Sequence, residues 1–156
     1  MNFDYLQPWV FPGHQKIKRQ IAVPWIRFGI YNPENPDKKI FIYGLADSGS
    51  DLTIVSRDIA DYLGYEINEK KGVKIAGVGG GMIEGYAREV GLIIEDTKNK
   101  DKTIEYATKI VFSKVKFPQS MPNQSAILGT IGFFTHLNVT FKCPLITIEE
   151  KPKRKE

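Results

Sequence analysis

The sequence has few of the residues from which disulfide frameworks and metal sites are built. Among its 156 residues there is one cysteine, Cys143, and there are two histidines, His14 and His136. A lone cysteine cannot form an internal disulfide, and His136 with Cys143 does not supply enough ligands at useful spacing for a metal ion. We therefore expect no cofactor and no metal, and a fold held together by its own hydrophobic core.

Long hydrophobic runs are also missing. No apolar stretch approaches the roughly 20 residues that cross a bilayer. Residues 1–5 lack the positive region and the apolar block of a secretory signal. The composition, 42% hydrophobic and 26% charged, is that of a globular protein of one domain. We expect no membrane partner and a reducing, cytoplasmic location.

A strong excess of charge is absent from most of the chain, although the formal net charge is +4. Residues 151–156 hold four of the 22 basic residues and one of the 18 acidic residues, so residues 1–150 carry 18 basic against 17 acidic side chains. A nearly neutral domain does not favour nucleic acid as a partner. We interpret residues 150–156 as a basic, disordered tail, with docking to an acidic partner as the alternative.

Strands dominate what the sequence does contain. Residues 1–20 show neither helical nor strand periodicity and are expected to form an irregular N-terminal arm, and residues 21–149 are expected to form the domain. Two short helices are predicted, over 57–63 between Ser56 as N-cap and Gly64 as terminator, and over 130–136. Apolar and β-branched periodicity predicts the strands, and the expected ranges are 21–31, 39–45, 73–94 as one long hairpin, 103–112, 126–129, 138–142 and 145–148.

An acidic residue directly follows one of the apolar runs. Asp47-Ser48-Gly49-Ser50 follows the strand that ends at Ala46 and precedes the apolar run 52–55. A carboxylate between buried strands is costly unless it is hydrogen-bonded, paired with another charge or kept protonated. Asp47 is therefore the first candidate for a catalytic residue.

Four glycines cluster at the tip of the predicted hairpin. A phosphate-binding loop is not favoured, because Met82 stands where a dinucleotide motif needs its third glycine and no Gly-Lys-Ser/Thr follows. The hairpin is then either a surface turn without function or a flexible cover over a site. A serine hydrolase built from Ser48 or Ser50 with a histidine lacks the Gly-x-Ser-x-Gly elbow and is also not favoured.

The order of these features resembles the retropepsin-like aspartic proteases, the single-domain relatives of pepsin. The resemblance lies in Ala46-Asp47-Ser48-Gly49-Ser50, in the glycine-rich stretch 77–85 and in Ile127-Leu128-Gly129. Residues 132–134 followed by 139–141 are similar to the stand-alone microbial members. The resemblance implies an all-β acid-protease barrel with a β-hairpin flap and one or two short helices.

The resemblance further implies an aspartic endopeptidase that works as a homodimer on polypeptide substrates. One chain supplies one catalytic aspartate, Asp47, on a loop completed by Ser48, Gly49 and Ser50, and the second aspartate comes from another copy. The substrate-binding residues that the resemblance implies are Leu45, Asp51, Ile54, Val78, Gly79, Gly80, Gly81, Met82 and Ile127.

Two alternatives stay open at this point. In the viral relatives the acid that matches Asp51 meets an arginine placed directly after the matching glycine, and here that position is Thr130. Arg27 or Arg57 could substitute, or Asp51 has a structural role. Plain core packing is the alternative role for Leu45, Ile54 and Ile127. The missing arginine also leaves room for a second function, a catalytically inactive homodimeric module that binds peptides.

Overall fold

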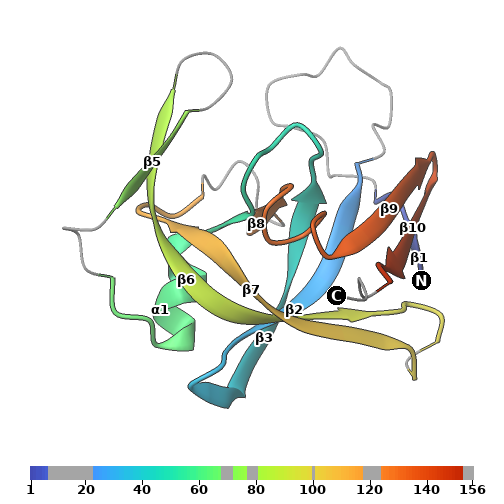
Figure 1. Cartoon of the computed structure of the whole chain (residues 1–156), viewed down its shortest axis with the longest axis horizontal. Coiled ribbons are helices and arrows are strands. Elements are labelled where there is room, and N and C mark those ends of the chain that lie inside the picture. The colour runs from blue at the N-terminus through green and yellow to red at the C-terminus, as the bar shows by residue number, and fades with distance from the viewer. Residues whose placement is uncertain (7–22, 68–71, 77–80, 100, 118–123, 153–156) are drawn as a thin grey trace.

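The computed structural model describes residues 1–6, 23–67, 72–76, 81–99, 101–117 and 124–152 (Figure 1). Within these ranges no helix is long and apolar enough to cross a membrane. The described elements are ten strands and one helix, in the order β1 (Asn2–Asp4), β2 (Trp25–Asn32), β3 (Asn35–Ala46), β4 (Ile54–Val55), α1 (Arg57–Leu63), β5 (Val73–Ala76), β6 (Met82–Glu95), β7 (Thr103–Ser113), β8 (Ala126–Leu128), β9 (Leu137–Lys142) and β10 (Leu145–Glu150). The predicted all-β class is confirmed.

The main sheet closes on itself. Its strand order is β2-β3-β8-β4-β7-β6-β5, and β2 also pairs with β6, so six strands form a ring and β5 lies outside it on β6. Most pairs are antiparallel, but β3 pairs in parallel with β8, and β4 in parallel with β7. A closed ring removes the unpaired edges that an open sheet exposes. The predicted barrel is therefore present.

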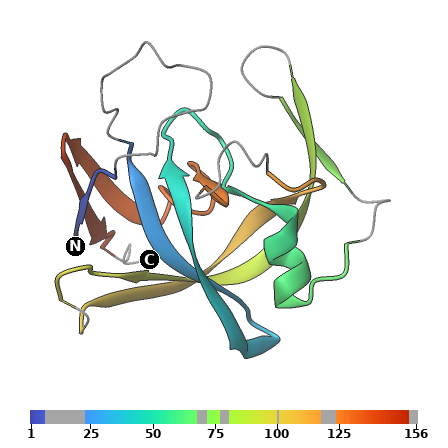
Figure 2. The ribbon, with the colours of Figure 1, turned by 180° about the vertical axis from the view of Figure 1, so that it is seen from behind.

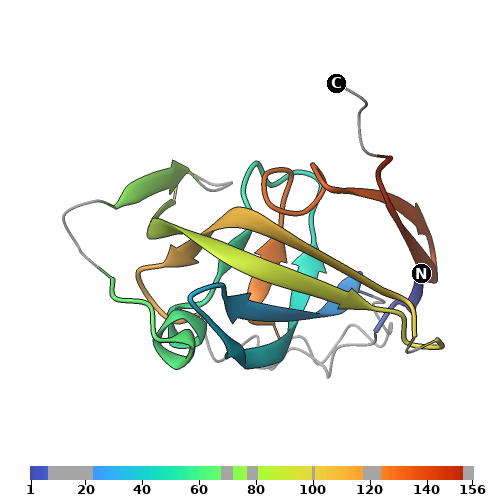
Figure 3. The same cartoon turned by 60° about the horizontal axis from the view of Figure 1, so that its bottom comes forward.

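A second sheet of three strands, in the order β1-β10-β9, lies at one side of the barrel. Figure 2 shows the same arrangement from behind, and Figure 3 shows this sheet at the end of the molecule opposite α1. Hydrophobic side chains of both sheets share one buried cluster, which includes Phe3 of β1, Phe28 of β2 and Ile148 of β10. The small sheet therefore completes the core.

Strand alternation separates two faces of the barrel wall. On β2, Ile26, Phe28 and Ile30 are fully buried and belong to the core cluster, as the period of two predicts. Trp25 and Arg27 alternate with them and point to the other face of the sheet. The hairpin turn between β2 and β3 is shorter than the gap between the predicted strands 21–31 and 39–45, because the two strands pair as far as Asn32 and Asn35.

The helix α1 forms over the predicted residues. Gly64 ends it in the left-handed conformation, with φ of 79°, and its N–H donates to the carbonyls of Ala60 and Asp61. Ser56 occupies the N-cap position, but its hydroxyl makes no capping bond to the helix. The Oγ of Ser56 instead donates to Asp58 Oδ1 (2.5 Å) and accepts the N–H of Phe117 (2.9 Å). Its role is to join the helix start to the chain beyond β7.

The second predicted helix, 130–136, does not form; this prediction was wrong. The segment is a series of turns in which Phe134 N–H donates to Gly129 O and Thr135 N–H to Thr130 O, both five residues back. Gly132 adopts φ of 98°, outside the right-handed helical region, and an added Cβ would lie 3.1 Å from Lys109 O and from Thr53 Cβ. Apolar spacing alone did not reveal this constraint on the backbone.

Both ends of the chain are more ordered than the sequence predicts. Residues 2–4 of the expected irregular arm form β1, which pairs with β10. At the other end, Glu150 belongs to β10, and Lys151 donates its N–H to His136 O and its Nζ to Phe134 O. Residues 7–20 of the arm and 153–156 of the tail lie outside the described residues.

Gly129, directly after β8, shows how closely two segments of the chain approach each other. A Cβ added at Gly129 would lie 2.3 Å from Leu52 O and 2.8 Å from Ser50 O, both backbone atoms that cannot turn aside. We predict that Gly129→Ala lowers the free energy of unfolding by about 3 kcal/mol or more, measured by denaturant unfolding.

Gly81→Ala is the matched control, because nothing lies within 4 Å of a Cβ added there. We expect its unfolding free energy to stay within about 0.5 kcal/mol of the parent. Equal stability of the Gly129→Ala protein and its parent would contradict the close approach.

Candidate active site

Asp47 lies immediately after β3, on a tight turn. Its N–H donates to Leu128 O (3.0 Å), and its own carbonyl accepts the N–H of Ser50 (3.1 Å). The carboxylate Oδ1 accepts the N–H of Gly49 (3.0 Å), and the side chain is half-buried. The sequence indicated that burial of a carboxylate between these strands costs free energy. In the structure, one backbone hydrogen bond and partial contact with solvent offset that cost.

The other residues of the turn differ in their surroundings. Ser48 and Gly49 are exposed, and a Cβ added at Gly49 would lie 3.3 Å from Asp47 Oδ1. Ser50 is half-buried, and its hydroxyl donates to Leu52 O (2.9 Å). Ser50 therefore stabilises the loop within one chain. A bond from Ser48 to a second copy stays a prediction.

Backbone hydrogen bonds join the Asp47 loop to the segment that follows β8. Thr130 N–H donates to Ser50 O and Ile131 N–H donates to Asp51 O, each at 2.8 Å. In return, Thr53 N–H donates to Ile131 O at 2.9 Å. Residues 80 positions apart in the sequence are thus interlocked. Ile127-Leu128-Gly129 lies beside the Asp47 loop.

Thr53 adds a side-chain link to this crossing of the Asp47 loop and the segment after β8, and we did not identify it from the sequence. Its hydroxyl accepts the N–H of Gly129 (3.1 Å) and lies 3.4 Å from Gly129 O, to which it donates. The side chain is fully buried. The available signal was a hydroxyl residue inside the apolar run 52–55, where a buried polar group requires a partner.

Leu45, Ile127 and Ile54 come together in one cross-strand row. Leu45 pairs with Ile127 across β3 and β8, and Ile127 pairs with Ile54 across β8 and β4. None of the three belongs to the main core cluster, although Ile54 is only 3% exposed. Trp25 and Val111 extend the row at its two ends. An apolar row therefore crosses the outer face of the barrel wall beside Asp47.

The glycine-rich hairpin is present as β5 paired with the start of β6. Gly81 and Met82 are exposed, and Met82 has 62% of its surface accessible. Val78, Gly79 and Gly80 lie outside the described residues. Figures 1 and 2 show the hairpin and the loop after β3 at the same end of the molecule. The role of the hairpin as a flap stays a prediction.

Asp51 has neither of the partners that the sequence suggested. Its side chain is exposed, and no ion pair of Asp51 occurs in the described ranges. Arg27 pairs with Glu95 (3.4 Å) and lies over the ring of Phe41, whereas Arg57 pairs with Asp61 (2.8 Å). Substitution of the missing arginine by Arg27 or Arg57 is therefore not observed.

His136 is not placed to activate a serine. Its ring stacks on Tyr106, with ring centroids 4.5 Å apart, and Nε2 lies 3.0 Å from Thr108 Oγ1. Burial, and then the charge of Lys151, lower the pKa of His136. His14 lies outside the described residues. Within the described part of the chain, no group of three or more potential ligands could hold a metal ion.

No family model and no curated protein matches the chain. Several solved structures are similar to it, among them the following two. The EIAV protease complexed with the inhibitor HBY-793 is 19% identical, with a TM-score of 0.44, over 73% of this chain and 85% of the other. A retropepsin-like aspartic protease from Rickettsia conorii is 12% identical, with a TM-score of 0.47, over 78% of each chain.

Both are proteases, and one is of the retropepsin-like class that the sequence resembles. The likeness is one of fold.

Substitution of Thr53 tests whether its hydrogen bonds to Gly129 stabilise the site. We predict that Thr53→Val lowers the free energy of unfolding by about 1–3 kcal/mol, because it leaves the buried N–H of Gly129 without its partner, whereas Gly129 O still accepts the N–H of Phe134. Thr53→Ser keeps the hydroxyl and is expected to retain more of the stability. Thermal or denaturant unfolding measures both. A serine variant less stable than the valine variant would contradict the role of the hydroxyl.

Proposed function

We propose that this chain is an aspartic endopeptidase that acts as a homodimer. The observation that carries the proposal is the position of Asp47, whose half-buried carboxylate is held by the N–H of Gly49 beside the row Leu45–Ile127–Ile54. A pure scaffold has no need for a carboxylate at this point. An acid placed next to an apolar row suits hydrolysis of a peptide whose side chains occupy that row.

The second carboxylate is proposed to come from a second copy. In the described ranges, no other acidic side chain is bonded to Asp47. In a symmetric dimer two copies of Asp47 face each other across the axis. Two like charges at close range cannot both ionise easily, so the pair shares one proton, which is the established behaviour of aspartic protease dyads.

The proposed mechanism uses the two carboxyl groups in different roles. The ionised one acts as general base and takes a proton from a water molecule, which then attacks the scissile carbonyl carbon. The protonated one donates a hydrogen bond to the carbonyl oxygen and polarises it. The proton taken from water then passes to the amide nitrogen as the C–N bond breaks, which releases an amine and a carboxylic acid. Shared protonation of this kind favours cleavage at mildly acidic pH.

The proposed substrate is an extended polypeptide with apolar side chains around the cleaved bond. Leu45, Ile54 and Ile127 would line side-chain pockets, and the peptide backbone would add to the sheet as a strand. The tip of the hairpin, with Val78, Gly79, Gly80, Gly81 and Met82, would close over it. Ser48 would bond between the subunits, Gly49 would allow close approach of the substrate, and Ser50 would hold the loop.

The wider expectations from the sequence belong to the same proposal. They are a protease domain over 21–149, action in the cytoplasm, and no partner of nucleic acid or membrane. The second candidate function is a homodimeric module that binds peptides without cutting them. The exposed Asp51, with no ion pair in the described ranges, favours this candidate, since the expected contact between Asp51 and an arginine is missing.

We predict that the purified protein cleaves an unfolded, apolar-rich polypeptide at mildly acidic pH and that Asp47→Asn abolishes cleavage. The amide keeps the shape of the side chain but can act neither as general base nor as a shared proton donor. Asp37→Asn is the matched control, because Asp37 is an exposed acid at the far end of β3 and is expected to leave the rate unchanged. Unchanged cleavage by the Asp47→Asn protein would falsify the assignment.

The shared site makes a separate prediction about mixtures. When parent protein is equilibrated with a tenfold excess of Asp47→Asn protein, most parent subunits enter hybrid dimers that hold one aspartate. We expect the cleavage rate to fall to roughly a tenth under random pairing. The Asp37→Asn protein at the same excess is expected to raise the rate.

The mixing test is read together with the mass in solution. An unchanged rate with the Asp47→Asn protein in excess, while light scattering shows dimers, would contradict a site shared between subunits. A monomeric mass at high concentration in the presence of substrate would contradict the homodimer itself.

A further inference from the structure

A cleft of about 480 Å³ lies away from the Asp47 loop, at the end of the barrel where β2 turns into β3. It is lined by the turn residues 32–34, by residues 64–66 after α1, and by Arg88 and Glu89 of β6. Its volume is within the range of about 300–1,000 Å³ that small-molecule sites occupy. Nothing in the proposed peptidase mechanism uses it.

Two walls of the cleft, residues 64–66 and strand β6, are joined by hydrogen bonds, and each wall donates one of them. The Tyr65 hydroxyl donates to Glu89 O (2.5 Å), and Arg88 donates to Glu66 O (2.7 Å). On the third wall, the nearly buried Asn32 accepts the N–H of Glu34 (3.0 Å). The cleft is therefore formed before any ligand enters, so little ordering is needed on binding.

Two opposite charges face this cleft without neutralising each other. Glu34 and Arg88 form no ion pair with each other, and in the described ranges neither has a carboxylate or ammonium partner elsewhere. Arg88 donates to two backbone carbonyls, those of Ala87 and Glu66, which leaves N–H groups of its guanidinium for a ligand. Charges of both signs are thus available on one small surface.

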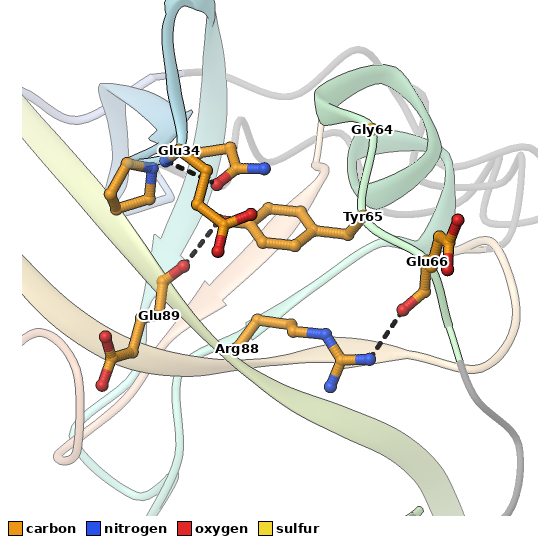
Figure 4. Close-up of a pocket in the computed structure, with 8 residues that line it drawn as sticks. Glu34, Gly64, Tyr65, Glu66, Arg88 and Glu89 are labelled. Atoms are coloured by element: carbon orange, nitrogen blue, oxygen red, sulfur yellow. Dashed lines mark hydrogen bonds between the residues drawn. The ribbon is translucent and has the colours of Figure 1, made fainter.

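Figure 4 shows how these groups are arranged. The carboxylate of Glu34 points to the hydroxyl end of Tyr65, while the side chains of Glu66 and Glu89 point away from the centre of the cleft. Burial raises the pKa of Tyr65 to about 12, the Glu34 and Glu89 carboxylates act in the same direction, and Arg88 opposes them. Tyr65 therefore stays neutral and presents a ring and a hydroxyl between the two charges.

We propose that this cleft binds a small zwitterion, a free amino acid or a short peptide with both ends uncapped. The ammonium group of the ligand pairs with the Glu34 carboxylate, and its carboxylate accepts hydrogen bonds from the Arg88 guanidinium. The Tyr65 ring offers a surface to an aromatic side chain. Neither a simple anion nor a simple cation uses both charged groups.

The site has a consequence for the glycine-rich hairpin. Arg88 and Tyr65 connect the segment that leads from α1 toward β5 with the middle of β6, and these are the two legs from which the hairpin extends. A ligand that bridges Glu34 and Arg88 connects β6 also to the turn between β2 and β3. Amino acids and short peptides are also the class of product that the proposed hydrolysis releases.

Binding can be measured without any cleavage, so the experiment uses the Asp47→Asn protein and is independent of the proposed function. The probes are phenylalanine, alanyl-phenylalanine, N-acetyl-phenylalanine and phenylalanine amide, titrated to millimolar concentrations and followed by amide chemical shifts in NMR spectra. We expect saturable binding of the two uncapped probes. Removal of either ligand charge by capping should weaken binding about tenfold or more.

Variants of the protein test the two charged groups. Glu34→Gln and Arg88→Met are expected to weaken binding of alanyl-phenylalanine about tenfold or more. Glu149→Gln is the matched control, since it makes the same charge change at an exposed residue of β10 that does not line the cleft, and is expected to stay within about twofold. Because Arg88 also holds Glu66 O, Arg88→Lys is a second variant that keeps the charge, and thermal unfolding verifies that each variant is folded.

Three results would overturn the proposal. They are absence of saturable binding at millimolar probe, equal binding of capped and uncapped probes, and an equal loss in the Glu34→Gln and Glu149→Gln proteins. Shifts confined to residues around the Asp47 loop would instead assign the ligand to the proposed active site.

Discussion

The structure depends most on the crossing between the Asp47 loop and the segment after β8. Backbone bonds from Thr130 and Ile131 reach Ser50 and Asp51, and the buried hydroxyl of Thr53 bonds Gly129. Only a residue without a side chain fits at Gly129, since backbone carbonyl oxygens lie where a Cβ would be. The position of Asp47 follows from this crossing, because the N–H of Asp47 donates to the carbonyl of Leu128, the residue directly before Gly129.

The crossing also gives the barrel wall two apolar faces near Asp47. One face packs into the core cluster through Ala46 and Leu128, and the other carries Leu45 and Ile127. A single β-strand alternates its side chains, so the same short segments build the core and line the candidate site. A substitution in the row Leu45–Ile127–Ile54 therefore alters strands whose neighbouring side chains pack in the core.

The two candidate sites lie at opposite ends of β3. Asp47 follows the last residue of the strand, whereas the cleft beside Glu34 precedes its first residue. Strand β6 connects the cleft with the glycine-rich hairpin, since Arg88 and Met82 belong to the same strand. The fold thus offers a physical path of paired strands between a binding cleft and the proposed cover of the active site.

The sequence by itself determined most of the strands, the helix α1 and the candidate acid. Alternation of apolar residues predicts β2, β6 and β7, and Asp47-Ser48-Gly49 between apolar runs marks the loop, because these signals are local. Only the tertiary structure decided that 130–136 is a series of turns, that Arg27 and Arg57 are engaged away from Asp51, and that Glu34 and Arg88 face one cleft. Each of these depends on contacts between residues far apart in the chain, which no local pattern encodes.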